Sequence, residues 1–259
     1  MKFFIAVLFF TSGIAHSLAD CGGQGMDFWP KGGIVKENPI FMVEGYANDE
    51  SIITALNSDY PIYLKSGDEI IQLVVQEICV GQFYLTQAIL TPESKLTVGK
   101  TYELIIENSP DYLNPLRTWN SATEKYEPVT WNVISGEDKT VPTWTQKPRE
   151  SKKTLVHYGC GPAIGVHYNF AVYDESPVLL KTTVTDLKSK VKTTYYLDAT
   201  ELSSIALGHG MCSGAFIFEK DSKEFTVTFD LVDGSGNLNL WTYDAISFTK
   251  PTELNSQQD

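Results

Sequence analysis

The stretch IYLKSGDEIIQLVVQEI, residues 62–78, decides the fold class. Its two runs, Ile62–Lys65 and Glu69–Ile78, are rich in β-branched and other apolar residues, and Ser66-Gly67-Asp68 between them is a turn signal. Similar short runs recur on both sides of this stretch, and no window of 12 or more residues shows a convincing helical repeat. The sequence therefore predicts an all-β protein in which sheet packs on sheet.

The β-type runs form two series. The first, between residues 38 and 135, comprises Ile40–Tyr46, Ile52–Leu56, Ile62–Lys65, Glu69–Ile78, Gln82–Leu90, Tyr102–Glu107 and Val129–Ile134. The second comprises Thr154–Tyr158, Val166–Val172, Val178–Thr185, Lys192–Leu197, Ala215–Phe218, Glu224–Val232 and Leu238–Phe248. The segment between the series is rich in charge, threonine and proline, as boundaries between compact units are. We expect a signal peptide over residues 1–19, a first sandwich over 20–138, a linker or interdomain segment over 139–153, a second sandwich over 154–250 and a polar tail over 251–259.

Two local motifs refine the expected sandwiches. In Leu96-Thr97-Val98-Gly99-Lys100-Thr101-Tyr102, a leucine lies six residues before a tyrosine that starts a strand, which resembles the tyrosine corner of immunoglobulin-like and fibronectin type III-like domains. Asp233-Gly234-Ser235-Gly236-Asn237 is similar to the last hairpin of bacterial immunoglobulin-like modules. The resemblance implies two tandem immunoglobulin-like antiparallel β-sandwiches, although the second half has Phe225 where a corner tyrosine is expected. Such a resemblance carries no function with it.

The amino terminus has the pattern of a secretory signal. Lys2 precedes the apolar run Phe3–Phe10, and small residues continue to Ala19. We therefore expect a secreted, periplasmic or cell-envelope protein. Leu18-Ala19-Asp20-Cys21 is also a rough lipobox, so a lipid anchor at Cys21 stays open as the less favoured alternative. No later stretch is long and apolar enough to predict a transmembrane segment.

Four cysteines occupy similar places in the two series. Cys21 and Cys79 are 58 residues apart, and Cys160 and Cys212 are 52 residues apart. Because an exported chain enters an oxidising compartment, an even number of cysteines favours disulfides. The sequence predicts the disulfides Cys21–Cys79 and Cys160–Cys212, one within each half.

A repeated His-x-x-Cys spacing suggests an alternative function. His157 lies three residues before Cys160, and His209 lies three residues before Cys212. Two imidazoles and two thiolates suit tetrahedral zinc, and copper accepts similar ligands. Extracytoplasmic zinc or copper binding by these four residues is the alternative, whereas the main interpretation includes no cofactor.

Charge and motifs disfavour two other classes of function. The formal net charge is −12 at pH 7, which repels nucleic acid. The Gly-x-Ser-x-Gly and His-Glu-x-x-His motifs of hydrolases do not occur in the sequence. We assign no catalytic residue, and an enzyme is the less favoured interpretation.

The most suggestive binding feature is the long segment between two predicted strands, from Asn108 to Pro128. Its Tyr112, Arg117, Trp119 and Tyr126 are of the residue types that are enriched at interface hot spots. We expect these four residues to mediate a non-catalytic interaction with a protein or another ligand. In the alternative, the aromatic residues fold back and cover the open end of the first sandwich.

Overall fold

The computed structural model describes residues 21, 24–113, 116–120, 123–200 and 203–253. Almost all of its regular structure is β-strand in antiparallel sheets, which confirms the all-β prediction. The predicted signal peptide lies outside the described residues. The boundaries expected for the two sandwiches stay a prediction.

The first half contains one short helix and ten strands. In order they are β1 (Gln24–Trp29), β2 (Gly33–Val35), β3 (Phe41–Ala47), α1 (Glu50–Thr54), β4 (Ile62–Ser66), β5 (Glu69–Val80), β6 (Leu85–Pro92), β7 (Thr101–Ile106), the 3-10 turn η1 (Asp111–Leu113), β8 (Arg117–Asn120), β9 (Lys125–Pro128) and β10 (Thr130–Val133). The long strand β5 pairs with β4 through its first residues and with β6 through its last ones, so it joins two layers. One layer is β1-β3-β6-β5 and the other is β4-β7-β10-β2. This matches the ABED and CFG strand order of an immunoglobulin sandwich, with β2 added beside β10.

Side chains that alternate between the two faces of each strand build the core of this half. In β3, Phe41 and Val43 point between the layers, and the ring of Phe41 meets that of Trp131 edge to face at 4.8 Å. The predicted tyrosine corner is present. Tyr102 is fully buried, and its phenolic oxygen accepts the Thr97 N–H at 3.1 Å and donates to the Glu69 carboxylate at 2.8 Å. The corner thus joins the loop before β7 to the start of β5.

The second half contains eight strands. They are β11 (Thr143–Tyr158), β12 (Gly161–Tyr173), β13 (Val178–Asp186), β14 (Lys192–Asp198), β15 (Ser204–His209), β16 (Glu224–Asp233), β17 (Leu238–Asn239) and β18 (Ile246–Thr249). One sheet has the order β11-β12-β15. The other has the order β14-β13-β16, and β17 and β18 pair with different parts of β16. Val166, Tyr168, Phe225 and Phe229 belong to the separate core of this half.

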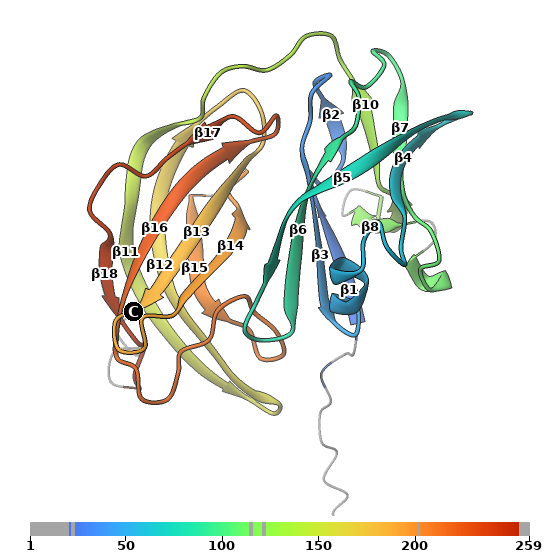
Figure 1. Cartoon of the computed structure of the whole chain (residues 1–259). Coiled ribbons are helices and arrows are strands. Elements are labelled where there is room, and N and C mark those ends of the chain that lie inside the picture. The colour runs from blue at the N-terminus through green and yellow to red at the C-terminus, as the bar shows by residue number, and fades with distance from the viewer. Residues whose placement is uncertain (1–20, 22–23, 114–115, 121–122, 201–202, 254–259) are drawn as a thin grey trace, which may run out of the picture.

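The two halves pack side by side, with β6 facing β14 (Figure 1). A third apolar cluster fills the contact between them, and it includes Trp29, Ile89 and Leu179. The buried Gln87 amide crosses the same contact. Its Nε2 donates to the Tyr196 carbonyl at 2.9 Å, and its Oε1 accepts the Tyr196 N–H at 2.8 Å. The halves are therefore joined by apolar packing and by satisfied polar groups.

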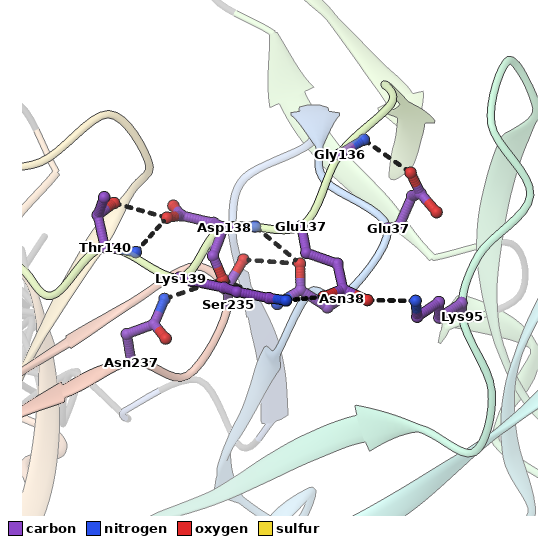
Figure 2. Close-up of polar contacts among 10 residues, drawn as sticks. All are labelled: Glu37, Asn38, Lys95, Gly136, Glu137, Asp138, Lys139, Thr140, Ser235 and Asn237. Atoms are coloured by element: carbon purple, nitrogen blue, oxygen red, sulfur yellow. Dashed lines mark hydrogen bonds and ion pairs between the residues drawn. The ribbon is translucent and has the colours of Figure 1, made fainter.

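The segment that connects the halves is held by hydrogen bonds (Figure 2). The Asp138 carbonyl accepts a hydrogen bond from Asn38 in the first half at 3.1 Å and another from Asn237 in the second half at 3.2 Å. The Asp138 N–H donates to Asn38 Oδ1 at 3.1 Å. The adjacent Glu137 pairs with Lys95 and Lys139, and the two ammonium groups lower its pKa to about 2. The connection is thus fixed to both halves.

Three local predictions are wrong. The run Ile52–Leu56 is expected as a strand, but α1 occupies Glu50–Thr54 because a helical turn starts after Asp49 and buries both Ile52 and Ile53. The run Ala215–Phe218 forms no strand, although its side chains at both ends are buried in the second core. The run Leu238–Phe248 is expected as one strand, but β17 ends at Asn239 and β18 begins at Ile246. Residues 143–153 of the segment expected between the sandwiches belong to β11.

The predicted disulfide pairing is also wrong. Cys21 bonds to Cys212 across 191 residues, with the two Cα atoms 5.5 Å apart. A sulfur in this bond cannot carry a lipid, so the structure excludes the alternative of a thioether anchor at Cys21. Cys79 is a buried thiol in the contact between the halves, and burial raises its pKa to about 11. Cys160 lies outside the disulfide, in the turn between β11 and β12.

No helix among the described residues has the length and apolarity that crossing a membrane requires.

The tyrosine corner gives a first testable prediction. Tyr102→Phe should lower the free energy of unfolding by about 1–2 kcal/mol, because the Thr97 N–H and the Glu69 carboxylate lose their hydrogen bonds to the Tyr102 hydroxyl. Denaturant titration followed by tryptophan fluorescence measures the change. Tyr173→Phe is the control, since that ring is 71% exposed and should change stability little. Equal stability of the two variants would contradict the corner.

The disulfide gives a second prediction. Peptide mapping without reduction should recover Cys21 joined to Cys212, and Cys212→Ser should lower stability by roughly 5 kcal/mol at most, because a very long loop is no longer closed in the unfolded chain. Cys79→Ser serves as the control for removing a sulfur that forms no disulfide. Recovery of Cys21 joined to Cys79 would show that the pairing across the halves is wrong.

Candidate binding surfaces

Strands β8 and β9 form a separate two-stranded hairpin in the first half, here called the arm. Strands β8 and β9 pair with each other, and no other described strand pairs with them. Trp119 lies directly opposite Tyr126, with the ring centroids 5.2 Å apart in an edge-to-face arrangement. Trp119 is 52% exposed and Tyr126 is 63% exposed. Arg117 is exposed at the start of the same hairpin. Three of the four predicted binding residues thus lie together on one arm.

The base of the arm is anchored in the first core. Leu113, Leu116 and Val129 are buried there, and the Val129 N–H donates to the Leu116 carbonyl at 3.0 Å. Binding by the four residues of the segment from Asn108 to Pro128 stays a prediction, and Leu113 and Leu116, not the aromatic rings, are the side chains of the segment that enter the core. The base of the segment covers the core, whereas its aromatic hairpin is exposed.

Tyr112 belongs to the base and not to the hairpin. Its hydroxyl donates to Asp49 Oδ1 at 2.6 Å, which ties η1 to the start of α1. Burial of the hydroxyl and its bond to Asp49 raise the pKa of Tyr112 to about 12. This hydroxyl is therefore already engaged within the molecule, unlike the rings of the arm.

A cleft of about 550 Å³ is the second candidate surface. Residues of β3 and β6 line it from the first half, and residues of β11, β12, β14 and β15 line it from the second. In Figure 1, the end of the long β11–β12 hairpin reaches toward the β5–β6 turn. That turn pairs with the segment after β15, because Phe83 and Gly214 exchange backbone hydrogen bonds at 3.1 and 2.7 Å. The cleft is thus framed by contacts between the halves.

Glu44 is the acidic group of the cleft. It lies on β3 opposite Asp27 of β1, and one of its oxygens accepts a hydrogen bond from Gln87 Nε2 at 2.6 Å. Burial raises the pKa of Glu44 above its ordinary value, and Asp27 acts in the same direction. Among the residues that the structure describes, no lysine, arginine or histidine forms an ion pair with Glu44.

Tyr195 supplies a hydroxyl without a partner. Its side chain is 2% exposed and lines the cleft, and its oxygen has no hydrogen-bond partner among the described residues. Burial raises the pKa of Tyr195, so the phenol is neutral and can donate. A buried phenol normally finds a partner, which makes this group notable.

Two histidines complete the polar lining. The His167 Nε2 lies 3.0 Å from Thr154 Oγ1, and burial together with Lys152 lowers the pKa of His167, so the ring is neutral at pH 7. The His209 Nδ1 lies 2.7 Å from the Gly210 carbonyl oxygen and therefore carries a proton.

The structure does not support the alternative zinc or copper site. Cys212 is bonded to Cys21 and offers no thiolate, so His157, Cys160, His209 and Cys212 cannot together form the expected set of ligands. Among the described residues, the group of acidic, histidine or cysteine side chains close enough to share an ion is Asp138, Asp174 and Asp233. Their oxygens already accept hydrogen bonds from neighbouring hydroxyl and amide groups, as the 2.5 Å bond from Ser176 to Asp138 shows.

Sequence reasoning missed the cleft. Its residues come from six strands, so no local spacing brings them together. One signal was available, because Glu44 directly follows the apolar run Phe41–Val43, which is buried on both faces of the strand. Nothing in the sequence indicates that the Tyr195 hydroxyl lacks a hydrogen-bond partner among the described residues.

Neither a protein-family model nor a curated protein matches this chain. Among solved structures, it is similar to the tandem Ig repeats of Dlar, with 9% identity over 86% of this chain and 95% of that chain and a TM-score of 0.22. A chain of a cytokine receptor complex shows 6% identity over 90% and 98%, with a TM-score of 0.25. Pullulanase type I from Bacillus subtilis str. 168 complexed with maltose shows 11% identity, covers 83% of this chain and has a TM-score of 0.25, and this chain spans only 23% of that enzyme. These values assign the chain to no family.

The difference between the exposed arm and its buried base can be tested by measuring the stability of variants. Replacing both Arg117 and Trp119 with alanine should lower the free energy of unfolding by less than about 1 kcal/mol, since both residues are exposed. Leu116→Ala should cost about 2–5 kcal/mol, because it opens a cavity in the first core. Denaturant titration separates the two cases. A double variant as unstable as Leu116→Ala would show that the arm packs against the core.

Proposed function

We propose that this chain is an exported, non-catalytic interaction protein that binds another protein through the arm formed by β8 and β9. The observation that carries this proposal is the pair of exposed aromatic rings, Trp119 and Tyr126, on a hairpin that pairs with no other described strand. Arg117 adds a cationic group with several hydrogen-bond donors to the same hairpin.

The anchored base of the arm supports this role. Leu113 and Leu116 fix the start of the hairpin in the core, so binding orders fewer new groups than it would in a fully flexible loop. The two rings also restrict each other by their edge-to-face contact. A partner therefore meets a rigid aromatic surface, which is the usual character of a binding hot spot.

Export is supported by two independent features. The signal pattern of Lys2, Phe3–Phe10 and Ala19 precedes Cys21, and the disulfide between Cys21 and Cys212 is a bond that persists in oxidising compartments. The acidic composition agrees with a protein partner and not with nucleic acid. We therefore place the protein outside the cytoplasm, secreted, in the periplasm or at the cell envelope.

Comparative capture tests the proposal. Wild-type protein and the double variant with alanine at Arg117 and Trp119 are used as baits for proteins of the native envelope and culture medium, and each protein retained by the wild type is then purified for calorimetry. The proposal expects the double variant to weaken binding at least about tenfold, since hot-spot side chains carry most of the interaction energy. Tyr173→Ala is the matched control, because it removes an aromatic ring that is 71% exposed at the end of β12. Equal affinity of the wild type and the double variant would rule the arm out.

A further inference from the structure

We propose that the cleft between the halves binds a small organic cation, an amine with an apolar body, whose ammonium group pairs with Glu44. This inference does not depend on the arm of the first half. It rests on a largely buried carboxylate that forms no ion pair with a described residue and that lines a cleft with mainly apolar walls.

The carboxylate of Glu44 sets the charge of the ligand. It is largely removed from water, it receives a hydrogen bond from the neutral Gln87 amide, and no described cationic side chain forms an ion pair with it. A buried charge without a counter-ion is costly, and a bound ammonium group removes that cost. The neighbouring Asp27 is paired with Lys31, and these two charges act on Glu44 in opposite directions. The neutral ring of His167 does not oppose a cation in the cleft.

The walls of the cleft indicate that the body of the ligand is apolar. Leu85, Val156, Ile164 and Leu197 are apolar, and Ala206 is short enough to leave the space open. The volume of about 550 Å³ lies within the range of small-molecule sites, roughly 300–1,000 Å³. A mainly apolar wall with a few polar groups is also the usual composition of such sites. The ligand is therefore an amphipathic amine and not a bare metal ion.

Three isosteric probes test the charge preference. Tyramine, its neutral analogue 4-(2-hydroxyethyl)phenol and its anionic analogue 3-(4-hydroxyphenyl)propionate are titrated separately into the full chain at pH 7.5 by calorimetry. Tyramine should bind at least about tenfold more tightly than either analogue, because a hydrogen bond to a charged group contributes about 1.5–3 kcal/mol. Failure of tyramine to bind, or equal affinity for the three probes, would overturn the proposal.

Variants locate the site. Glu44→Gln should abolish the preference for tyramine over the neutral analogue. Glu93→Gln is the matched control, because that carboxylate is exposed and lies outside the cleft. Should Glu44→Gln fail to fold, as circular dichroism would show, Ala206→Phe fills the cleft from an exposed strand position and should eliminate tyramine binding. Undiminished binding by the folded cleft variants would place the amine elsewhere and overturn the proposal.

Discussion

The contact between the two halves depends on the buried amide of Gln87. Its side chain takes the place of a neighbouring strand beside β14, because it both donates to and accepts from the backbone of Tyr196. Each of these groups would otherwise be a buried polar atom without a partner. Apolar packing alone would allow the sheets to slide, whereas this pair of directional bonds fixes their register. The apolar contact around Trp29, Ile89 and Leu179 is built on that register.

The same contact explains why a cleft exists. Large side chains such as Trp29 fill the space between the halves where the third cluster lies. On the other side of Gln87, the facing residues diverge toward the gap between β14 and β15, and nothing of comparable size fills it. The halves therefore pack tightly at the third apolar cluster and leave the cleft open on the other side of Gln87. The exposed arm is separate, since its anchors Leu113 and Leu116 lie in the first core.

Local features of the sequence were predictable, and long-range pairings were not. The runs of β5 and β16 and the corner at Tyr102 follow from alternation and from a short motif, and the structure confirms them. The bond between Cys21 and Cys212 does not follow, because similar spacings cannot tell which cysteines meet after the halves pack. Glu44 and the residues of β12, β14 and β15 come to line one cleft through that same packing. The arm was predictable in part. Its aromatic composition indicated a candidate binding segment, whereas the sequence did not indicate that β8 would pair with β9.

The covalent link between the halves also determines how the molecule carries a mechanical load. A pulling force applied before Cys21 and after Cys212 passes through their sulfur atoms, so the backbone between them bears no tension. All of the first half and the strands β11 to β15 lie inside this shielded loop. Among the described strands, β16, β17 and β18 lie in the loaded path, so unfolding under load would begin in the second half, whereas the first half and its arm would stay shielded. Reduction of one bond would place every strand of the chain under tension.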